Sequence, residues 1–268
     1  MTNKFVFIKA FTCRIWPILH GATIKDKINM LSYAMLITIF PKLLLDTSPL
    51  PRKLKSRIEA LKVCLCRNSI VCFKINADRV CFKPVDNESL WILSHVFEPY
   101  TLRYILKYLS KGDVFIDVGA HIGKYTVIAA KLVGNNGSVI AIEPHPYNFK
   151  TLLYNIRLNK LNNVIPLNIA AWDSETMADL YIGKSSGGHS FKTLSGSKIR
   201  VYARPLDNVI DELKLSKVDL IKVDVEGAEA EVLRGLKRTI HRFKPIILIE
   251  IWNMDIAVSY THLTLPTN

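Results

Sequence analysis

From residue 112 onward the sequence alternates short apolar runs with amphipathic stretches, and this alternation limits the fold more than any other feature. Three apolar runs, DVFIDVG, GSVIAIEP and NVIPLNIAAWD, come first, and VDLIKVDVEG and PIILIEIW follow an irregular section. Runs that are apolar throughout are typical of parallel strands buried on both faces. Helical patterns lie between the runs, and right-handed crossovers then favour an α/β fold, a doubly wound, mostly parallel sheet with strand order 3-2-1-4-5.

The part of the chain before this alternation shows a different pattern. Residues 1–58 are basic and partly apolar, and we predict a helical N-terminal segment there. Residues 59–110 predict a small β-hairpin, with strands at 69–75 and 79–83, and then two helices that Pro99 separates.

The alternating part predicts one main domain over residues 111–256. The stretch 257–268 shows no further helix or strand pattern, so we interpret it as a tail, either an artefact or an ordinary frayed end, and leave it out of the fold prediction.

Positive charge is concentrated near the N-terminus. The net charge is +13, and residues 1–60 hold ten Lys and Arg against three Asp and Glu. Such a segment suits an anionic partner or forms a solvated face, and both interpretations stay open. Residues 28–41 are uncharged and too short to span a bilayer, so they predict a buried helix, which we favour, or an interfacial one. We interpret residues 46–57 as a linker.

The number and spacing of the cysteines indicate the kind of cellular compartment in which the protein is expected. There are five of them, at positions 13, 64, 66, 72 and 81. The odd count and the loose spacing argue against a disulfide framework, and no paired C-x-x-C or His partner follows at zinc-site spacing. We therefore interpret them as small packing residues. The expected location is cytoplasmic, with room for peripheral contact between the basic N-terminal segment and the inner face of the membrane.

A glycine-bearing turn directly follows the first predicted strand. It reads DVGAHIG, with Gly119 and Gly123 four residues apart and Asp117 before them. Glu143, at the end of the second predicted strand, can accept hydrogen bonds from both ribose hydroxyls of an adenosine. A dinucleotide turn would read G-x-G-x-x-G, but position 121 is His. The turn is closer to that of proteins that bind S-adenosylmethionine (SAM).

Five segments, FIDVGAHIGKYT, AIEPHPYNFKTLLYNIRLN, NIAAWDSE, RPLDNVI and IKVDVEGAEAEVLRGL, together resemble the FkbM-type family of SAM-dependent methyltransferases, over about residues 86–252. The resemblance implies a Rossmann-like class I methyltransferase fold and O-methylation of a hydroxyl on a sugar, glycolipid or natural product. Two departures stand out. His121 lies where the family commonly has Asn, and the closing antiparallel strands are expected to be missing after the fifth strand.

The resemblance also implies residue roles. The residues of the SAM loop would be Asp117, Gly119, Ala120, His121 and Gly123. Glu143 would hold the ribose. The residues that border the adenine would be Ala171, Trp172 and Asp173.

Acidic residues at the end of the fourth predicted strand are the candidates for catalysis. Asp224 is our first choice of general base, followed by Glu226 and then His189, with His145 weaker. Acids there also suit the start of the helix near residue 228, which is the alternative interpretation. Two neighbouring acids are thin evidence for a metal, so we predict none. The Gly- and Ser-rich stretch 183–197 predicts a substrate lid or a plain surface connection.

Two other classes of function stay open. One is an NAD(P)-dependent oxidoreductase on a Rossmann-like fold, and the other is a truncated, non-catalytic SAM-binding module. The expected partner is a small-molecule or glycan acceptor. Nucleic acid is disfavoured, because no N/D-P-P-Y/F motif follows the fourth predicted strand.

Overall fold

The computed structural model describes residues 21–39, 51–93, 97–183, 185–192 and 197–250. The chain divides into two compact units. The first comprises Met1–Arg103 and Leu153–Lys160, and the second comprises Tyr104–Leu152 and Leu161–Asn268. The boundaries at 58, 110 and 256 that we drew from the sequence stay predictions, and the tail after residue 256 lies outside the described residues.

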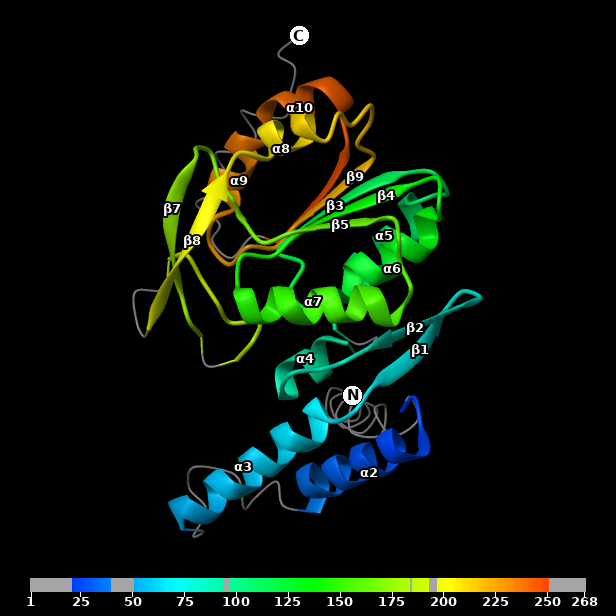
Figure 1. Cartoon of the computed structure of the whole chain (residues 1–268), viewed down its shortest axis with the longest axis vertical. Helices are drawn as coiled ribbons and strands as arrows, with labels where there is room; N and C mark the ends of the chain where they lie inside the picture. The colour runs from blue at the N-terminus through cyan, green and yellow to red at the C-terminus, as the bar shows by residue number, and fades with distance from the viewer. Residues whose placement is uncertain (1–20, 40–50, 94–96, 184, 193–196, 251–268) are drawn as a thin grey trace, which may run out of the picture. The chain divides into compact units, whose positions relative to one another are not determined.

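The second unit is built on a sheet of five parallel strands (Figure 1). The strands are β3 (Val114–Val118), β4 (Ser138–Ile142), β5 (Val164–Leu167), β9 (Leu220–Val223) and β10 (Ile246–Ile249). Their spatial order is β10-β9-β3-β4-β5. This order confirms the 3-2-1-4-5 arrangement that the alternating sequence predicts. The carboxyl ends of β3, β4 and β9 therefore meet at one edge of the sheet.

Helices cover both faces of this sheet (Figure 1). One face carries α6 (Lys124–Val133) and the first part of α7 (Pro146–Leu158). The other face carries α8 (Leu206–Glu212), α9 (Glu229–Gly235) and α10 (Lys237–Phe243). Isoleucines of the strands pack there against valines and leucines of α8 and α9 in one buried cluster. Burial on both sides explains why the strands read as unbroken apolar runs.

A second, three-stranded sheet occupies the section that we interpreted as irregular. It contains β6 (Ala170–Ala171), β7 (Thr176–Tyr181) and β8 (Lys198–Arg204) in the order β6-β8-β7. The predicted third strand over 163–173 was therefore wrong in part, because β5 and β6 belong to different sheets. Strands β7 and β8 pair antiparallel and bury alternate residues, so their apolar pattern is short and interrupted by polar side chains.

The first unit contains the predicted hairpin and helices. Its elements are α2 (Ile24–Ile39), α3 (Arg52–Arg67), β1 (Val71–Ile75), β2 (Asp78–Phe82), α4 (Asn87–Ile92) and the start of α5 (Pro99–Tyr108). The hairpin of β1 and β2 confirms the predicted hairpin. Helix α4 ends at Ile92 and helix α5 begins at Pro99, which confirms the prediction of two separate helices. The linker over 46–57 was wrong from residue 52, because α3 begins there, directly after Pro51. Residues 40–50 lie outside the described part.

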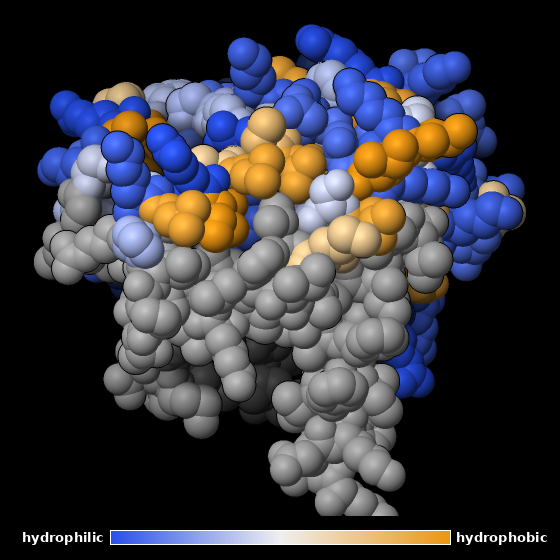
Figure 2. Space-filling view, turned by 90° about the horizontal axis from the view of Figure 1, so that it is seen from below, coloured by the Kyte–Doolittle hydropathy of each residue, from blue (hydrophilic) through white to orange (hydrophobic). Residues whose placement is uncertain are grey.

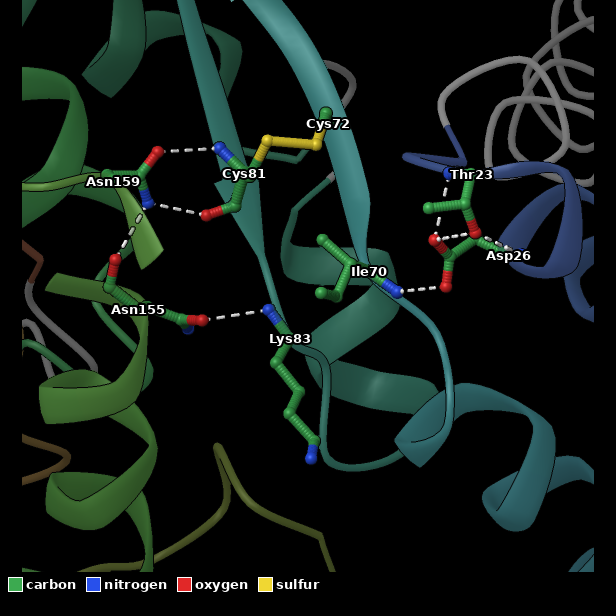
Figure 3. Close-up of a disulfide and its surroundings, with 8 residues drawn as sticks. All are labelled: Thr23, Asp26, Ile70, Cys72, Cys81, Lys83, Asn155 and Asn159. Atoms are coloured by element: carbon green, nitrogen blue, oxygen red, sulfur yellow. Dashed lines mark hydrogen bonds between the residues drawn. A yellow bond between two sulfur atoms is a disulfide. The ribbon is translucent and has the colours of Figure 1, made fainter. Parts of the chain in front are cut away.

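A disulfide joins the two strands of the hairpin (Figure 3). Cys72 and Cys81 stand directly opposite each other, with their α-carbons 4.1 Å apart. Our interpretation of these two residues as free packing residues was therefore wrong, since linear spacing does not reveal which residues a hairpin brings face to face. Cys66 is buried and free, as expected, whereas Cys64 is exposed. Disulfides persist in oxidising compartments and are rare in the cytoplasm. This bond therefore does not support the expected cytoplasmic location, which stays a prediction.

Two asparagines at the end of α7 hold the free edge of β2 (Figure 3). The Asn159 side chain accepts a hydrogen bond from the Cys81 N–H (2.8 Å) and donates one to the Cys81 carbonyl (2.6 Å). The Asn155 side chain accepts from the Lys83 N–H (2.8 Å). Buried amides thus satisfy backbone groups that an edge strand would otherwise leave unpaired.

Candidate active site

The turn after β3 requires glycine at position 119. Its φ is 81°, and a Cβ built there would lie 1.8 Å from the main-chain carbonyl oxygen of Asp224, at the end of β9. At Gly123 a Cβ would lie 2.6 Å from a methyl group of Leu152 on α7. The close approach of neighbouring elements, as well as the backbone conformation, therefore fixes the spacing of the two glycines.

Asp117 offers an unused acceptor inside this turn. The residue is buried, and its Oδ2 accepts a hydrogen bond from the Thr126 hydroxyl (2.6 Å). Its Oδ1 has no hydrogen-bond partner within the described part of the chain. Burial raises the pKa of this carboxyl, while the nearby Lys222 acts to lower it. A buried carboxylate oxygen without a donor suits a cationic donor on a ligand.

Glu143, directly after β4, connects the turns that follow β3 and β4. Its Oε2 accepts from the His121 N–H and its Oε1 from the His145 N–H, each at 2.8 Å. Burial raises the pKa of Glu143 to about 7. A carboxylate offers about four acceptor positions. The two backbone donors and a hydrogen bond from the Asn148 side chain leave acceptor capacity on this carboxylate for a ligand hydroxyl.

His121 fits the backbone conformation of this turn. Its φ is 53°, in the left-handed region. Asn and His are both among the residues enriched in that region. The backbone conformation therefore explains why His is tolerated at this position. Ala120 next to it is buried, and its N–H donates to the Ile142 carbonyl at the end of β4.

A lysine that we did not single out from the sequence lies beside Asp224. The Lys222 ammonium forms an ion pair with the Asp224 Oδ2 (2.8 Å) and lies 5.1 Å from the centre of the Tyr125 ring. The Lys222 side chain is only 5% exposed, against 23% for Asp224. In the sequence, the only indication of this ion pair was a single lysine inside the apolar run LIKV, two residues before Asp224.

Glu226 and Gly227 form a left-handed turn between β9 and α9, with φ values of 51° and 104°. The Glu226 carbonyl accepts from the Ser190 hydroxyl (2.7 Å). A Cβ at Gly227 would lie 3.1 Å from the aliphatic stem of Lys192. The Glu229 carboxylate, rather than that of Glu226 or Asp224, accepts from the Gly227 N–H (2.9 Å). The N-cap residue of α9 is Ala228, so neither Asp224 nor Glu226 occupies the capping position that we had considered for them.

Two imidazoles bring the Gly- and Ser-rich loop against the turn after β4. The rings of His145 and His189 have centres 4.0 Å apart. The Nδ1 of His189 accepts from the Gly183 N–H (3.1 Å), which leaves the proton of a neutral ring on Nε2. The pKa of His145 is lowered to about 4 by burial and by His189. The role of His189 as a general base stays a prediction.

Two further asparagines, also missed from the sequence, hold these loops together. The Asn148 side chain donates to the Ser186 carbonyl (2.9 Å), so the start of α7 anchors the loop. The Asn168 side chain donates to the carbonyls of Glu143 (2.8 Å) and Pro144 (3.0 Å). These contacts link the carboxyl ends of β4 and β5 to the described part of the predicted lid.

The residues expected around the adenine make other contacts in this structure. Ala171 is buried in β6. The Trp172 ring packs against the Phe191 ring at 5.3 Å, and the Asp173 carboxylate accepts from the Arg234 side chain (3.0 Å). Their contact with an adenine stays a prediction.

The chain is similar to known methyltransferases. The family model of the methyltransferase FkbM domain matches residues 117–262. Hexuronic acid methyltransferase AglP of Haloferax volcanii is 28% identical over 169 residues, which cover 61% of this chain and 66% of that protein. Methyltransferase sdnD of Sordaria araneosa is 25% identical over 214 residues, which cover 66% of this chain and 81% of that protein. This chain thus spans slightly less than two thirds of the length of AglP.

Among solved structures, a methyltransferase FkbM from Methylobacillus flagellatus aligns with a TM-score of 0.43 and 17% identity. The alignment covers 87% of this chain and 54% of that one.

Proposed function

The chain belongs to the FkbM methyltransferase domain family, whose methyl donor is S-adenosylmethionine, and from this premise we propose that it methylates a hydroxyl oxygen of a sugar-containing acceptor. The observation that carries the proposal is the buried Asp117 Oδ1 without a partner in the described part of the chain, close to the turn that Gly119 permits. This oxygen suits the ammonium group of SAM, which a nicotinamide dinucleotide lacks.

Glu143 supports the same cofactor. Its two backbone donors fix both carboxylate oxygens at the ends of β3 and β4, and the remaining acceptor capacity suits a ribose hydroxyl. Ala120, His121 and Gly123 form the proposed loop around the amino-acid half of the cofactor. Their N–H groups donate hydrogen bonds within the protein, so the loop would contribute its shape and its carbonyl acceptors. The residues present therefore fit SAM.

SAM supplies an electrophilic methyl group, and the protein has to position and deprotonate the acceptor. An alcohol becomes a good nucleophile only if its proton leaves during attack, so a general base accelerates the transfer. We assign this role to Asp224. Its Oδ2 is held by Lys222, which orients the carboxylate and leaves Oδ1 to take the hydroxyl proton. Holding the acceptor in place supplies a further part of the rate.

A sugar acceptor is supported by two observations. AglP, at 28% identity, is described as a hexuronic acid methyltransferase. In this chain the stem of Lys192 packs on Gly227, next to the acids at the end of β9, and Lys192 is exposed. Its ammonium would attract an acidic sugar, and hydroxyl groups of the Gly- and Ser-rich loop would bind sugar hydroxyls.

The test is a labelled-methyl transfer assay with the full chain. Radiolabelled SAM is offered with glycans that contain hexuronic acid, with neutral glycans and with lipid-linked sugars, and mass spectrometry locates the methyl group. We expect a methyl ether on a sugar, with hexuronic acid glycans preferred. Binding of SAM without transfer to any acceptor would favour a non-catalytic module. Stabilisation by NAD but not by SAM would overturn the cofactor assignment.

A further inference from the structure

Helix α2 is apolar on two sides, but only one of them is buried. Met30, Tyr33 and Ala34 are at most 7% exposed. On another side lie Ile24, Ile28, Leu31 and Met35, with exposed fractions of 79%, 58%, 42% and 50%. Their spacing of four, three and four residues places them in one stripe along the helix. A helix that is apolar all round is normally covered all round, so this stripe is expected to contact something.

The exposed charges of α2 are all positive. Lys25 and Lys27 are exposed near the start of the stripe. The only acidic residue of the helix, Asp26, is buried. Its carboxylate accepts from the N–H groups of Thr23 (2.9 Å) and Ile70 (2.8 Å), as Figure 3 shows. The acid is therefore committed to holding α2 against the hairpin and does not offset the lysines at the surface.

Helix α3, which packs beside α2, also has exposed apolar residues next to exposed basic residues. Leu54 and Leu61 are seven residues apart and are 42% and 48% exposed. Lys53 and Arg57, on the same helix, are exposed as well. Figure 2, viewed from the side on which α2 and α3 are drawn in Figure 1, shows apolar patches between hydrophilic side chains.

We propose that the apolar stripe of α2 and its flanking lysines dock on the surface of an anionic lipid bilayer. Apolar side chains on one face with lysines beside them are the features by which interfacial helices bind such membranes. Charge complementarity favours lipid headgroups over an average protein surface. No helix in the described ranges is long and apolar enough to cross a membrane. Contact in the plane of the interface is the mode that this stripe fits, and it does not depend on the identity of the methyl acceptor.

The experiment is vesicle flotation with the full chain. Neutral phosphatidylcholine vesicles are compared with vesicles in which part of that lipid is replaced by phosphatidylglycerol. We expect the protein to float with the anionic vesicles and this binding to weaken as salt is added. The triple substitution Ile24→Ser, Ile28→Ser, Met35→Ser should reduce binding at least tenfold. Lys25→Gln with Lys27→Gln should remove the preference for anionic lipid.

The control is Met177→Ser, on β7, which removes an apolar side chain of similar exposure (46%) outside the stripe and should leave flotation unchanged. Because all the substituted residues are exposed, circular dichroism and thermal unfolding should match those of the unmodified protein. Failure to float with either kind of vesicle would overturn the proposal, as would unchanged flotation of the triple variant. Dissociation of a dimer by the triple substitution would show that a second copy covers the stripe, and this too would overturn it.

Discussion

Gly119 and Asp224 approach each other so closely that a Cβ on the glycine would lie 1.8 Å from the carbonyl oxygen of the aspartate. This approach brings the turn after β3 against the end of β9. Gly119→Ala must either push the two strand ends apart or adopt a strained backbone. We expect a loss of about 2–4 kcal/mol in the free energy of unfolding and SAM binding weakened at least tenfold.

Gly134→Ala is the matched control for Gly119→Ala. Gly134 also has a positive φ, 65°, but a Cβ there would meet nothing within 4 Å. The expected cost of Gly134→Ala is that of the backbone conformation alone, about 1–3 kcal/mol, and SAM affinity should not change. Chemical denaturation and calorimetric titration measure both quantities. Equal losses for the two variants would contradict the steric explanation.

The pKa of Glu143, raised to about 7 by burial, predicts pH-dependent cofactor binding. The ionised carboxylate has more acceptor capacity for ribose hydroxyls than the protonated form. Affinity should therefore rise as pH increases from about one unit below to one unit above 7. The measurement uses 5′-methylthioadenosine, which has the ribose but not the titrating amino-acid group of SAM. Glu143→Ala should weaken binding at least tenfold and remove the dependence. A flat profile in the unmodified protein would remove Glu143 from the ribose site.

The raised pKa of Glu143 also makes the free energy of unfolding depend on pH. The folded-state pKa lies above the ordinary value of 4.5, so the folded protein binds more protons than the unfolded chain between about pH 4.5 and 7. The contribution of Glu143 to the free energy of unfolding is therefore fully present below pH 4.5 and is lost as pH rises through 7. Glu143→Gln should remove this decline in urea unfolding measured across that window. A decline of the same size in the variant would assign it to another group.

Asp224→Asn should lower turnover more than SAM affinity, because the amide cannot take the acceptor proton. A reduction of about 100-fold in kcat is expected for the loss of a general base. Asp179→Asn is a suitable control, since Asp179 also pairs with a lysine, Lys198, but on β7. Steady-state kinetics and calorimetric titration separate the two effects. A proportional loss of turnover and affinity in Asp224→Asn would make Asp224 a cofactor ligand instead of a base.

The hairpin disulfide should stabilise the first unit. Replacing both Cys72 and Cys81 by Ala opens a covalent loop with a sequence separation of 9 and should lower the free energy of unfolding by on the order of 2–3 kcal/mol. Mass spectrometry under non-reducing conditions verifies the bond, and urea unfolding with and without a reductant measures its effect. Substituting Cys64, which is exposed and free, should have no such effect. Unchanged stability after reduction would contradict the prediction.

Asn159→Ala should destabilise the protein by at least about 2 kcal/mol, because both backbone groups of Cys81 then lose their partner. The exposed Asn162, three residues further along the chain, provides the control. Urea unfolding of Asn159→Ala and Asn162→Ala compares the two. Similar stability of both variants would show that water replaces the amide at the edge of β2.

The sequence was informative where a single physical rule determines a residue pattern. Doubly buried parallel strands must be apolar throughout, and right-handed crossovers leave few topologies, so the order of the five strands could be predicted. The acid and glycine spacing also predicts where a nucleoside cofactor would lie, and this position stays a prediction. The antiparallel strands β7 and β8 were missed because each buries only alternate residues over a short length.

By itself, the sequence determined the five-stranded order and the positions of Asp117, Gly119, Glu143 and Asp224 at the ends of strands, because backbone periodicity and turn geometry act locally. Only the tertiary structure decided the pairing of Lys222 with Asp224, the bond between Cys72 and Cys81, and the asparagine contacts with β2. Each of these depends on which side chains are brought together across separate elements. That outcome is set by packing and register, which a linear pattern does not encode.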